Sequence, residues 1–452
     1  MEQETRSTKA PAVYDISSYT NVPAADNTDQ KQIAPTKTDV IIQGVALFSD
    51  GYNVQVIGYM NLILAKLYPH DLTASVKTRL SNSILVGEVL GMLFFGWAID
   101  KLGRRIGVVL ATFALVFGIV LATASHGSSV HGLLWMMIIG RGIAGFGAGG
   151  EYAVCTTQAL ECADSDPKLQ GSRGLLTAVS TNFAIVSGFF GSCIVSLVVV
   201  GAYHNEPHEA IWRICFGIGI ALPLVIFCFR IRMIDSTQYR KHSIKHDIPY
   251  GLALRLYWRP LVGCCLAWFL YDFVVYPFNL LAPTLVSGFS SNQTLVQKIG
   301  YSGLVNAFAI PGSFFGAFLL DWIGRKETYT LGWTVVTVFG FVIGGSMLHL
   351  RHVFPLFVVL YGIFQSFLSL GPGNCNFLVS SESFPTPLRG HLLGFAAAVG
   401  KAGAAIGTTA LSSLLDSYSD TNEGQQVIFL VGSALSFVGT AIVWFMIPKV
   451  RI

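Results

Sequence analysis

The chain has 452 residues, of which 52% are hydrophobic and only 12% are charged. Soluble proteins usually carry about 25% charged residues, so this composition excludes an ordinary soluble enzyme and predicts a membrane protein with many spans. The formal net charge of +4 is small and no basic run is present, which gives no indication of nucleic-acid binding.

Residues 1–38 are polar and lack hydrophobic periodicity, which predicts a disordered cytoplasmic tail. They also lack the apolar core of a signal peptide. Twelve apolar stretches follow, each long enough to cross about 30 Å of hydrocarbon. A polar linker, 232–257, divides the chain into halves at 39–231 and 258–448, and 449–452 form the C-terminal end. The predicted spans are 40–66, 76–100, 106–125, 132–160, 172–200, 211–231, 260–287, 297–321, 328–349, 354–381, 389–416 and 426–447.

The first half of the chain recurs in the second. Asp100 and Asp321 stand in matching Asp-x-x-Gly-Arg motifs, and the motif repeats at an offset of 221 residues. Asp50 and Asp272 take equivalent places in the first span of each half, at an offset of 222. An internal repeat is stronger evidence for the fold than any single residue. Parallel half-repeats with a site at their interface are typical of transporters.

Basic residues cluster in the loop between spans two and three, in the central linker and in the loop between spans eight and nine. The opposite loops carry few of them. By the positive-inside rule, both termini are therefore predicted to be cytoplasmic. Asn292 then falls in an external loop, within an Asn-x-Thr glycosylation motif.

Two carboxylates are predicted at membrane depth, where a charge is expensive and usually functional. Asp272 shares one helix face with Trp268, Tyr276 and Asn279, because these residues follow at intervals of four, four and three. Asp50 is its counterpart in the first half. Glu88, also within a span, is predicted to make a hydrogen bond at a helix interface.

The repeated Asp-x-x-Gly-Arg loops, together with Arg141-Gly-Ile-Ala-Gly145, resemble motifs of the major facilitator superfamily. The resemblance covers the whole chain. It implies an all-α membrane protein of twelve helices in two six-helix repeats, with a cavity open to one side at a time. It also implies a cytoplasmic gate, in which the two aspartates cap helix ends and engage basic residues. The predicted gate residues are Asp100, Arg104, Arg105, Asp321 and Arg325.

Within that superfamily, three segments are similar to the phosphate:proton symporters: Gly149-Gly150-Glu151-Tyr152, Trp268-x-x-x-Asp272-x-x-x-Tyr276, and the stretch from Ser381 to Lys401. The chain departs from them at Glu151, where the family has Asp, at Thr181, where it has Gln, and at Gly373, which precedes Asn374. Smaller side chains around a phosphate leave room for a group attached to it. The segment around Asp50 and Gly371-Pro-Gly-Asn374 resembles the fungal glycerophosphoinositol permeases, which are proton symporters for glycerophosphodiesters in the plasma membrane.

This resemblance assigns two sets of residues. The predicted proton-coupling set is Asp50, Arg141, Glu151 and Asp272, and the predicted substrate set is Tyr152, Thr181, Trp268, Asp272, Tyr276, Asn279, Asn374 and Lys401. Lys401 is the one lysine deep in a predicted span, and it either pairs with Asp272 or binds the substrate phosphate as a point charge. Asp50 either pairs with Arg141 or relays protons.

The sequence thus predicts a proton-coupled importer of a small anionic solute, with glycerophosphoinositol or glycerophosphocholine as substrate. Inorganic phosphate is the alternative substrate, and a transporter-like nutrient receptor is the alternative class. No enzyme motif is present, and the eight cysteines show no metal or disulfide spacing. Protons are the only expected coupling agent, without a cofactor or metal. The lipid bilayer and the solute are the expected partners, and a monomer is the expected functional unit.

Overall fold

The computed structural model describes residues 37–102, 104–165, 170–233, 250–289, 293–384, 386–418 and 420–447, and every regular element in these ranges is a helix. Most of the predicted N-terminal tail, most of the central linker, Asn292 and the last five residues lie outside them. The described helices belong to one compact unit.

The first six predicted spans correspond to the helices of the first half. Spans five and six are each divided into two helices. The helices are α1 (Lys37–Leu67), α2 (Ala74–Leu102), α3 (Arg104–Thr123), α4 (Val130–Ser165), α5 (Arg173–Ser180), α6 (Asn182–Ala202), α7 (Glu209–Ile218) and α8 (Ala221–Met233), with a short 3₁₀ turn, η2 (Gln170–Ser172), before α5.

The last six predicted spans form the second half in the same way. The helices are α10 (Tyr250–Leu280), α11 (Ala282–Ser287), α12 (Leu295–Ala307), α13 (Ala309–Trp322), α14 (Arg325–Gly345), α15 (Met347–Leu350), α16 (Phe354–Leu368), α17 (Asn374–Glu382), α18 (Thr386–Asp416) and α19 (Thr421–Met446). A π-helical turn, η3 (Ser369–Gly373), joins α16 to α17. The predicted twelve-span, all-α architecture is confirmed.

Nine helical stretches in the described ranges are long and apolar enough to cross a membrane by composition alone. The first three spans are not among them, and the described apolar part of the third, Val109–Thr123, is too short. Helix α2 carries Lys77, Arg79 and Glu88, and these charges lower its mean hydropathy. Polar groups at membrane depth are tolerated where protein buries them, and Glu88 is fully buried.

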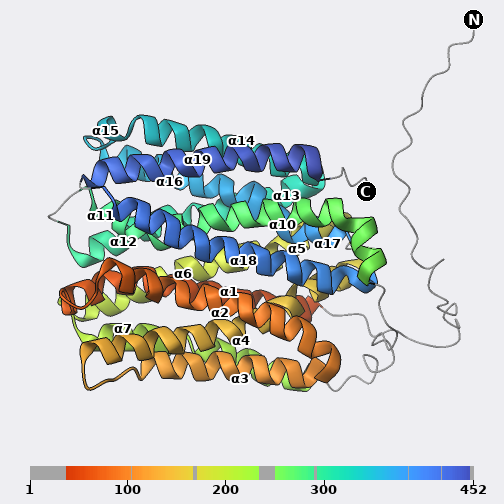
Figure 1. Ribbon diagram of the computed structural model, residues 1–452, viewed down its shortest axis with the longest axis horizontal. Coiled ribbons are helices and arrows are strands. Elements are labelled where there is room, and N and C mark those ends of the chain that lie inside the picture. Colours follow the sequence, from red (N-terminus) through yellow and green to blue (C-terminus); the bar gives the residue numbers. More distant parts are fainter. Residues whose placement is uncertain are drawn as a thin grey trace, which may run out of the picture. The chain divides into compact units, whose positions relative to one another are not determined.

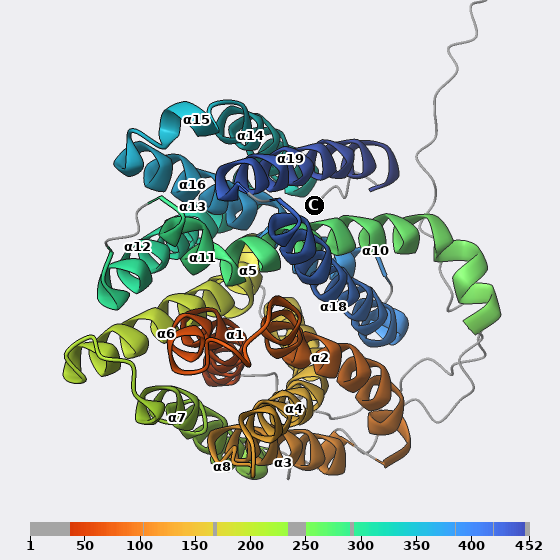
Figure 2. The same cartoon turned by 60° about the vertical axis from the view of Figure 1, so that its left-hand side comes forward.

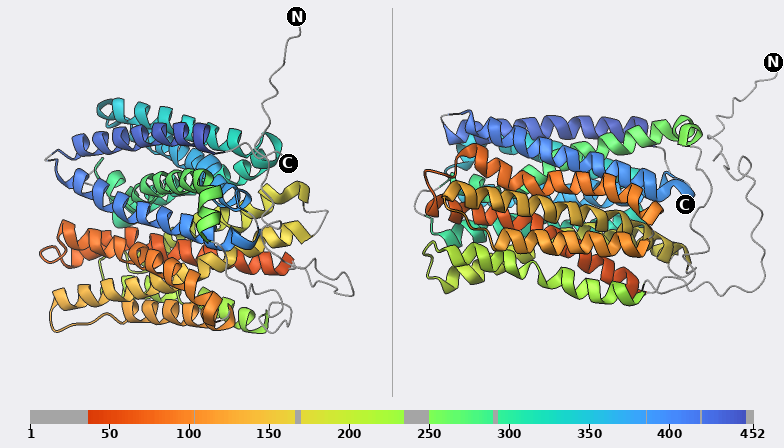
Figure 3. Two further views of the ribbon diagram at one scale, coloured as in Figure 1. Left: turned by 45° about the vertical axis from the view of Figure 1, so that its right-hand side comes forward. Right: turned by 60° about the horizontal axis from the view of Figure 1, so that its bottom comes forward.

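The two halves lie side by side, with their long helices running roughly along a common direction (Figures 1 and 2). Helices α1 to α4 and α6 to α8 gather in one half, and α10 to α19 gather in the other. Across the boundary, α2 packs against α18, α6 against α12, and α5 against α13. The two further views in Figure 3 show the same division. The boundary is where side chains of both repeats can meet.

Several long spans are interrupted near this boundary. Thr181, with φ −116° and ψ −92°, separates α5 from α6. The π-helical turn η3 contains Pro372, which cannot donate a backbone hydrogen bond. Such π segments are frequent at functional sites. The breaks place polar side chains in the interior of the protein, among them Asn182 and Ser369.

Candidate functional site

Lys401 lies at the centre of a buried polar cluster. Its side chain, on α18, is 1% exposed, and its Nζ lies 2.9 Å from Oε2 of Glu88 on α2, which is 0% exposed. The ammonium also donates to the Tyr276 hydroxyl of α10. It lies 4.2 Å from the Tyr276 ring centroid and 5.0 Å from that of Tyr152 on α4. One cation therefore joins two helices of each half.

The sequence did not identify Glu88 as part of this site. Glu88 was expected to make an interface hydrogen bond, and Asp272 was one expected partner of Lys401. The ion pair in the structure is with Glu88. A lone acid in the middle of α2 and a lone lysine in α18 were a usable signal, since buried charges pair. Sequence spacing within one helix cannot rank acids that stand on different helices.

Asp272 and Asp50 complete the group of charges. Asp272 on α10 is 2% exposed, and its Oδ2 has no hydrogen-bond partner in the part of the chain that is described. Asp50 on α1 is 6% exposed and lies close to Glu88. Both aspartates are within electrostatic range of Lys401. The two acids at equivalent places in the repeats are thus brought to one site.

Arg141, on α4, is buried beside this cluster. Its Nε donates to the Leu80 carbonyl at 3.1 Å and its Nη1 donates to the Asn53 carbonyl at 3.2 Å. These bonds connect α4 to α2 and α1. The guanidinium also lies 5.6 Å from the Phe216 ring centroid and within electrostatic range of Glu88. Arg141 thus holds the first-half helices together while adding positive charge near the acids.

Aromatic rings enclose one side of the cluster. Phe377, on α17, lies between Tyr152 and Trp268, with ring centroids 5.7 and 5.0 Å away. Trp268 also packs against Gly400, where an added Cβ would lie 2.4 Å from the Trp268 Cδ1. The structure therefore brings together Tyr152, Trp268 and Tyr276, as well as Phe377, which sequence reasoning missed because phenylalanine is common in any membrane helix.

Three other predicted substrate residues are engaged in bonds away from Lys401. Asn279 donates to the Val275 carbonyl at 2.7 Å and accepts from Gln365 at 3.0 Å. The Thr181 hydroxyl donates to the Thr177 carbonyl at 2.6 Å. Asn374 accepts from Asn182 at 2.9 Å. These side chains maintain helix contacts in this conformation.

Asn182 links the halves at a second polar centre. Its amide nitrogen, at the start of α6, also donates to the Ser313 hydroxyl at 3.0 Å and to the Ser369 carbonyl at 3.1 Å. Ser313 and Ser369 both belong to the second half. The sequence pointed to Thr181 rather than to Asn182 beside it, because the break between α5 and α6 that turns Asn182 inward was not predicted.

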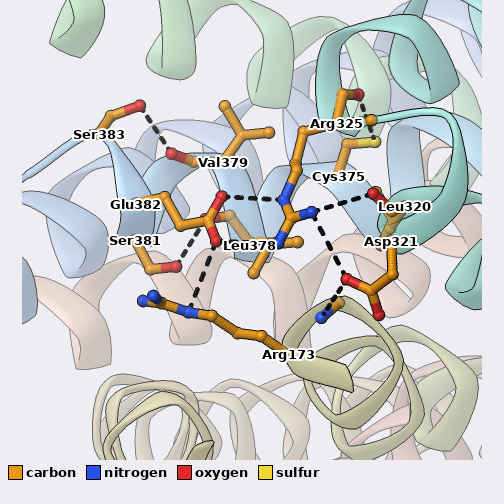
Figure 4. A network of polar contacts seen from close by, with 12 residues as sticks. Arg173, Leu320, Asp321, Arg325, Cys375, Leu378, Val379, Ser381, Glu382 and Ser383 are labelled. Carbon is orange, nitrogen blue, oxygen red and sulfur yellow. Dashed lines mark hydrogen bonds and ion pairs between the residues drawn. The ribbon is translucent and has the colours of Figure 1, made fainter. Parts of the chain in front are cut away.

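A charged network joins the halves at the end of the bundle that is predicted to be cytoplasmic (Figure 4). Asp321 of α13 accepts hydrogen bonds from the backbone amides of Gly174 and Leu175, both at 2.9 Å. A carboxylate is favourable there because the amides at a helix N-terminus are unpaired and carry partial positive charge. A Cβ on Gly174 would lie 2.5 Å from the Asp321 Oδ1, so glycine permits this contact.

Three more charges surround this cap. Arg325 lies 3.5 Å from Asp321 and 3.2 Å from Glu382, measured between nitrogen and oxygen. Glu382 also lies 3.5 Å from Arg173 of the first half. The network thus holds α5 against α13 and α17. The other predicted gate residues, Asp100, Arg104 and Arg105, and the predicted proton-coupling residue Glu151, have side chains outside the described part of the structure.

Replacing Asp321 by alanine is expected to loosen α5. Hydrogen bonds to a charged group contribute about 1.5–3 kcal/mol, which corresponds to about tenfold to a hundredfold in an equilibrium. Hydrogen exchange of the Gly174 and Leu175 amides, followed by mass spectrometry, should quicken by that factor. Glu209→Ala, at the first turn of α7, is the matched control. Unchanged exchange in Asp321→Ala would show that the cap does not hold α5.

Comparison with known proteins agrees with this architecture. The family model described as "Sugar (and other) transporter" matches residues 40–248 and 231–452. Glycerophosphoinositol permease 1 of Candida albicans is 38% identical over 416 residues, which span 91% of this chain and 78% of the relative. Glycerophosphocholine permease GIT4 of the same organism is 33% identical over 90% of this chain and 77% of its own length.

A solved structure supports the fold alone. The xylose transporter XylE from E. coli, in a partially occluded inward-open conformation, superposes with a TM-score of 0.71 at 16% sequence identity. The alignment covers 91% of this chain and 98% of XylE. The repeats, the helices and these matches, among them an MFS-type transporter of Aspergillus flavus that is 32% identical over 98% of this chain and 90% of its own length, agree: the chain belongs to the sugar (and other) transporter family of the major facilitator superfamily, whose members are membrane transporters rather than enzymes.

Proposed function

We propose that the protein is a proton-coupled symporter that imports glycerophosphodiesters, glycerophosphoinositol above all, across the plasma membrane by alternating access. The observation that carries this proposal is the buried Lys401 ammonium, which lies between the two halves among acids and aromatic rings. Relatives named as glycerophosphoinositol and glycerophosphocholine permeases support the substrate class.

The chemistry around Lys401 suits a phosphodiester. Lysine binds a phosphate group as a point charge, and a phosphodiester carries one negative charge. Tyr152, Tyr276 and Trp268 present apolar rings with polar tips, a combination that fits a ligand with both a glycerol backbone and a head group. To reach the ammonium, the phosphodiester must displace Glu88 from it. Binding of the phosphodiester at Lys401 therefore depends on whether Glu88 is paired with the ammonium.

The balance of charges gives a reason for proton coupling. Among the described side chains the cluster holds three acids, Asp50, Glu88 and Asp272, and two cations, Lys401 and Arg141. One proton makes this set neutral. A monoanionic substrate adds one negative charge, which a second proton would balance, and uncompensated charge is costly in a buried site. We therefore expect one proton to accompany each substrate molecule, with Asp272 as its carrier.

Alternating access requires that both sides can open. The cluster is buried, and the Asp321 cap with the Glu382 network joins the halves at the proposed cytoplasmic end. Release of these contacts would open a path to the cytoplasm. With both termini cytoplasmic, as the distribution of basic residues predicts, the opposite end of the bundle faces the outside.

Uptake of labelled glycerophosphoinositol by cells expressing the chain tests the proposal. We expect accumulation above the external concentration, stronger at acidic than at neutral pH, and resistant to excess inorganic phosphate. Competition by glycerophosphocholine measures the tolerance for the head group. Uptake of phosphate alone would make the protein a phosphate symporter, and specific binding without accumulation would make it a receptor. Cells without the chain are the control.

A further inference from the structure

A cavity of about 450 Å³ lies between α2 and α18, away from the Lys401 cluster. It is at the end of the bundle that is predicted to be external, since it begins at the first turn of α2 and reaches the last residues of α18. Its volume is within the range of about 300–1,000 Å³ that small-molecule sites occupy. The residues that matter here are Thr78, Arg79 and Asn82 of α2 and Thr409, Ser413 and Asp416 of α18.

The cavity combines apolar surface with polar groups. Pockets for small molecules are typically apolar with a few polar groups that fix the ligand, and eight of the nine residues that line this one have a polar or charged side chain. Arg79 is exposed and forms no ion pair within the described ranges, and its guanidinium lies 5.7 Å from the Trp135 ring centroid. Such a guanidinium can bind a phosphodiester with two parallel hydrogen bonds. Asp416 and the hydroxyl groups can hydrogen-bond a polyol.

The two helix faces that line the cavity continue toward Lys401. Asn82 pairs with Ala405 and Thr409, whereas Glu88, further along α2, pairs with Lys401, earlier on α18. The two helices are therefore antiparallel. Lys401, Ala405, Thr409 and Ser413 follow at intervals of four and share one face of α18. The same two helix faces line the cavity at one end and hold the buried ion pair at the other.

One polar link separates the cavity from the ion pair. The Asn82 side-chain amide donates to the Thr409 hydroxyl at 2.5 Å and to the Ala405 carbonyl at 2.9 Å. Asn82 is 9% exposed, and it also lines the cavity. It therefore forms the floor of the cavity.

We infer that this cavity is an outer binding site, where a phosphodiester with a polyol head group binds before it passes Asn82 to Lys401. Arg79 binds the phosphodiester anion, and Asp416 with the neighbouring hydroxyl groups binds the polyol. This inference rests on the proposed function for the choice of ligand. It adds a second site and a specificity filter that uses residues outside the Lys401 cluster.

Protection of a cysteine in the cavity tests the site without relying on transport. Thr78→Cys would be labelled from outside intact cells with a membrane-impermeant maleimide, and the unchanged chain gives the background. Glycerophosphoinositol should slow labelling several-fold, whereas inositol or inorganic phosphate at the same concentration should not. Adding Arg79→Gln should remove the protection. Arg351 is an exposed arginine after α15, on the same predicted external face. Adding Arg351→Gln should leave the protection intact.

Transport kinetics give a second readout. In the otherwise unchanged chain, Arg79→Gln should raise KM for glycerophosphoinositol about tenfold, as expected for loss of a charge-assisted hydrogen bond, and leave the maximal rate unchanged. If the unchanged chain accumulates glycerophosphoinositol while Thr78→Cys is not protected and Arg79→Gln keeps its KM, the outer site is overturned and the proposed function stands. If the unchanged chain accumulates no glycerophosphoinositol, the proposed function fails. Protection of Thr78→Cys from labelling would still show whether glycerophosphoinositol binds in the cavity.

A membrane lipid with the same head group is the other possible occupant. Purified Thr78→Cys protein in vesicles of phosphatidylcholine, with and without phosphatidylinositol, separates the two sources. If the labelling rate is the same in both kinds of vesicle and only soluble glycerophosphoinositol slows it, the site binds the free solute. Protection by phosphatidylinositol alone would identify a lipid site and overturn the inference.

Discussion

Replacing Lys401 by methionine is expected to abolish uptake of glycerophosphoinositol and to lower the melting temperature of the purified protein. Methionine has a similar length but no charge, so Glu88 would be left buried without its 2.9 Å partner. Removing one member of a buried ion pair destabilises a protein by about 3–5 kcal/mol. Uptake would fail for a further reason, because the phosphodiester would lose the cation proposed to bind it.

A second substitution separates these two effects. The double variant Lys401→Met with Glu88→Met replaces the pair by two apolar side chains of similar size, and such replacements are often neutral for stability. We expect its melting temperature to return toward that of the unchanged protein while uptake stays absent. Lys66→Met, at the exposed end of α1, is the matched control and should change neither quantity. Normal uptake by the double variant would show that Lys401 does not bind the substrate.

The twelve spans were predictable because a membrane imposes a strong rule on sequence: each crossing needs about 20 apolar residues. The predicted fourth span, 132–160, and helix α4, Val130–Ser165, illustrate the agreement. The breaks within spans were not predicted. Thr181 and the π-helical turn at Ser369–Gly373 depend on bonds to other helices, among them those of Asn182. A break supported by tertiary contacts leaves only a weak trace in local sequence.

The candidate site was predictable to a similar degree. Internal repetition singled out Asp50 and Asp272, and the cost of charge in a membrane singled out Lys401, so the members of the cluster were mostly foreseen. Which acid touches Lys401 was not foreseen. Glu88 meets Lys401 because α2 packs against α18 at these two residues. Which residues of the two helices face each other depends on the packing of whole helices.

Replacing Asp272 by asparagine is expected to uncouple substrate movement from the proton gradient. Asn keeps the size and polarity of the side chain but cannot carry a proton. A pH difference of one unit supplies about 1.4 kcal/mol per proton, so a symporter moving one proton with each monoanion can reach about tenfold accumulation. In Asp272→Asn this ratio should fall to about one. Exchange of labelled for unlabelled glycerophosphoinositol should persist, because exchange needs no net proton movement.

The measurement is accumulation in vesicles that contain the purified protein, with the pH difference and the membrane potential imposed separately. One proton moving with one monoanion transfers no net charge, so uptake by the unchanged protein should follow the pH difference and ignore the potential. Asp71→Asn, in the exposed loop between α1 and α2, is the control and should behave like the unchanged protein. Full pH-dependent accumulation by Asp272→Asn would exclude Asp272 as the carrier. The coupling proton would then have to reside on another acid, either Asp50 or Glu88, which lie beside Lys401, or Glu151, the remaining acid of the predicted proton-coupling set.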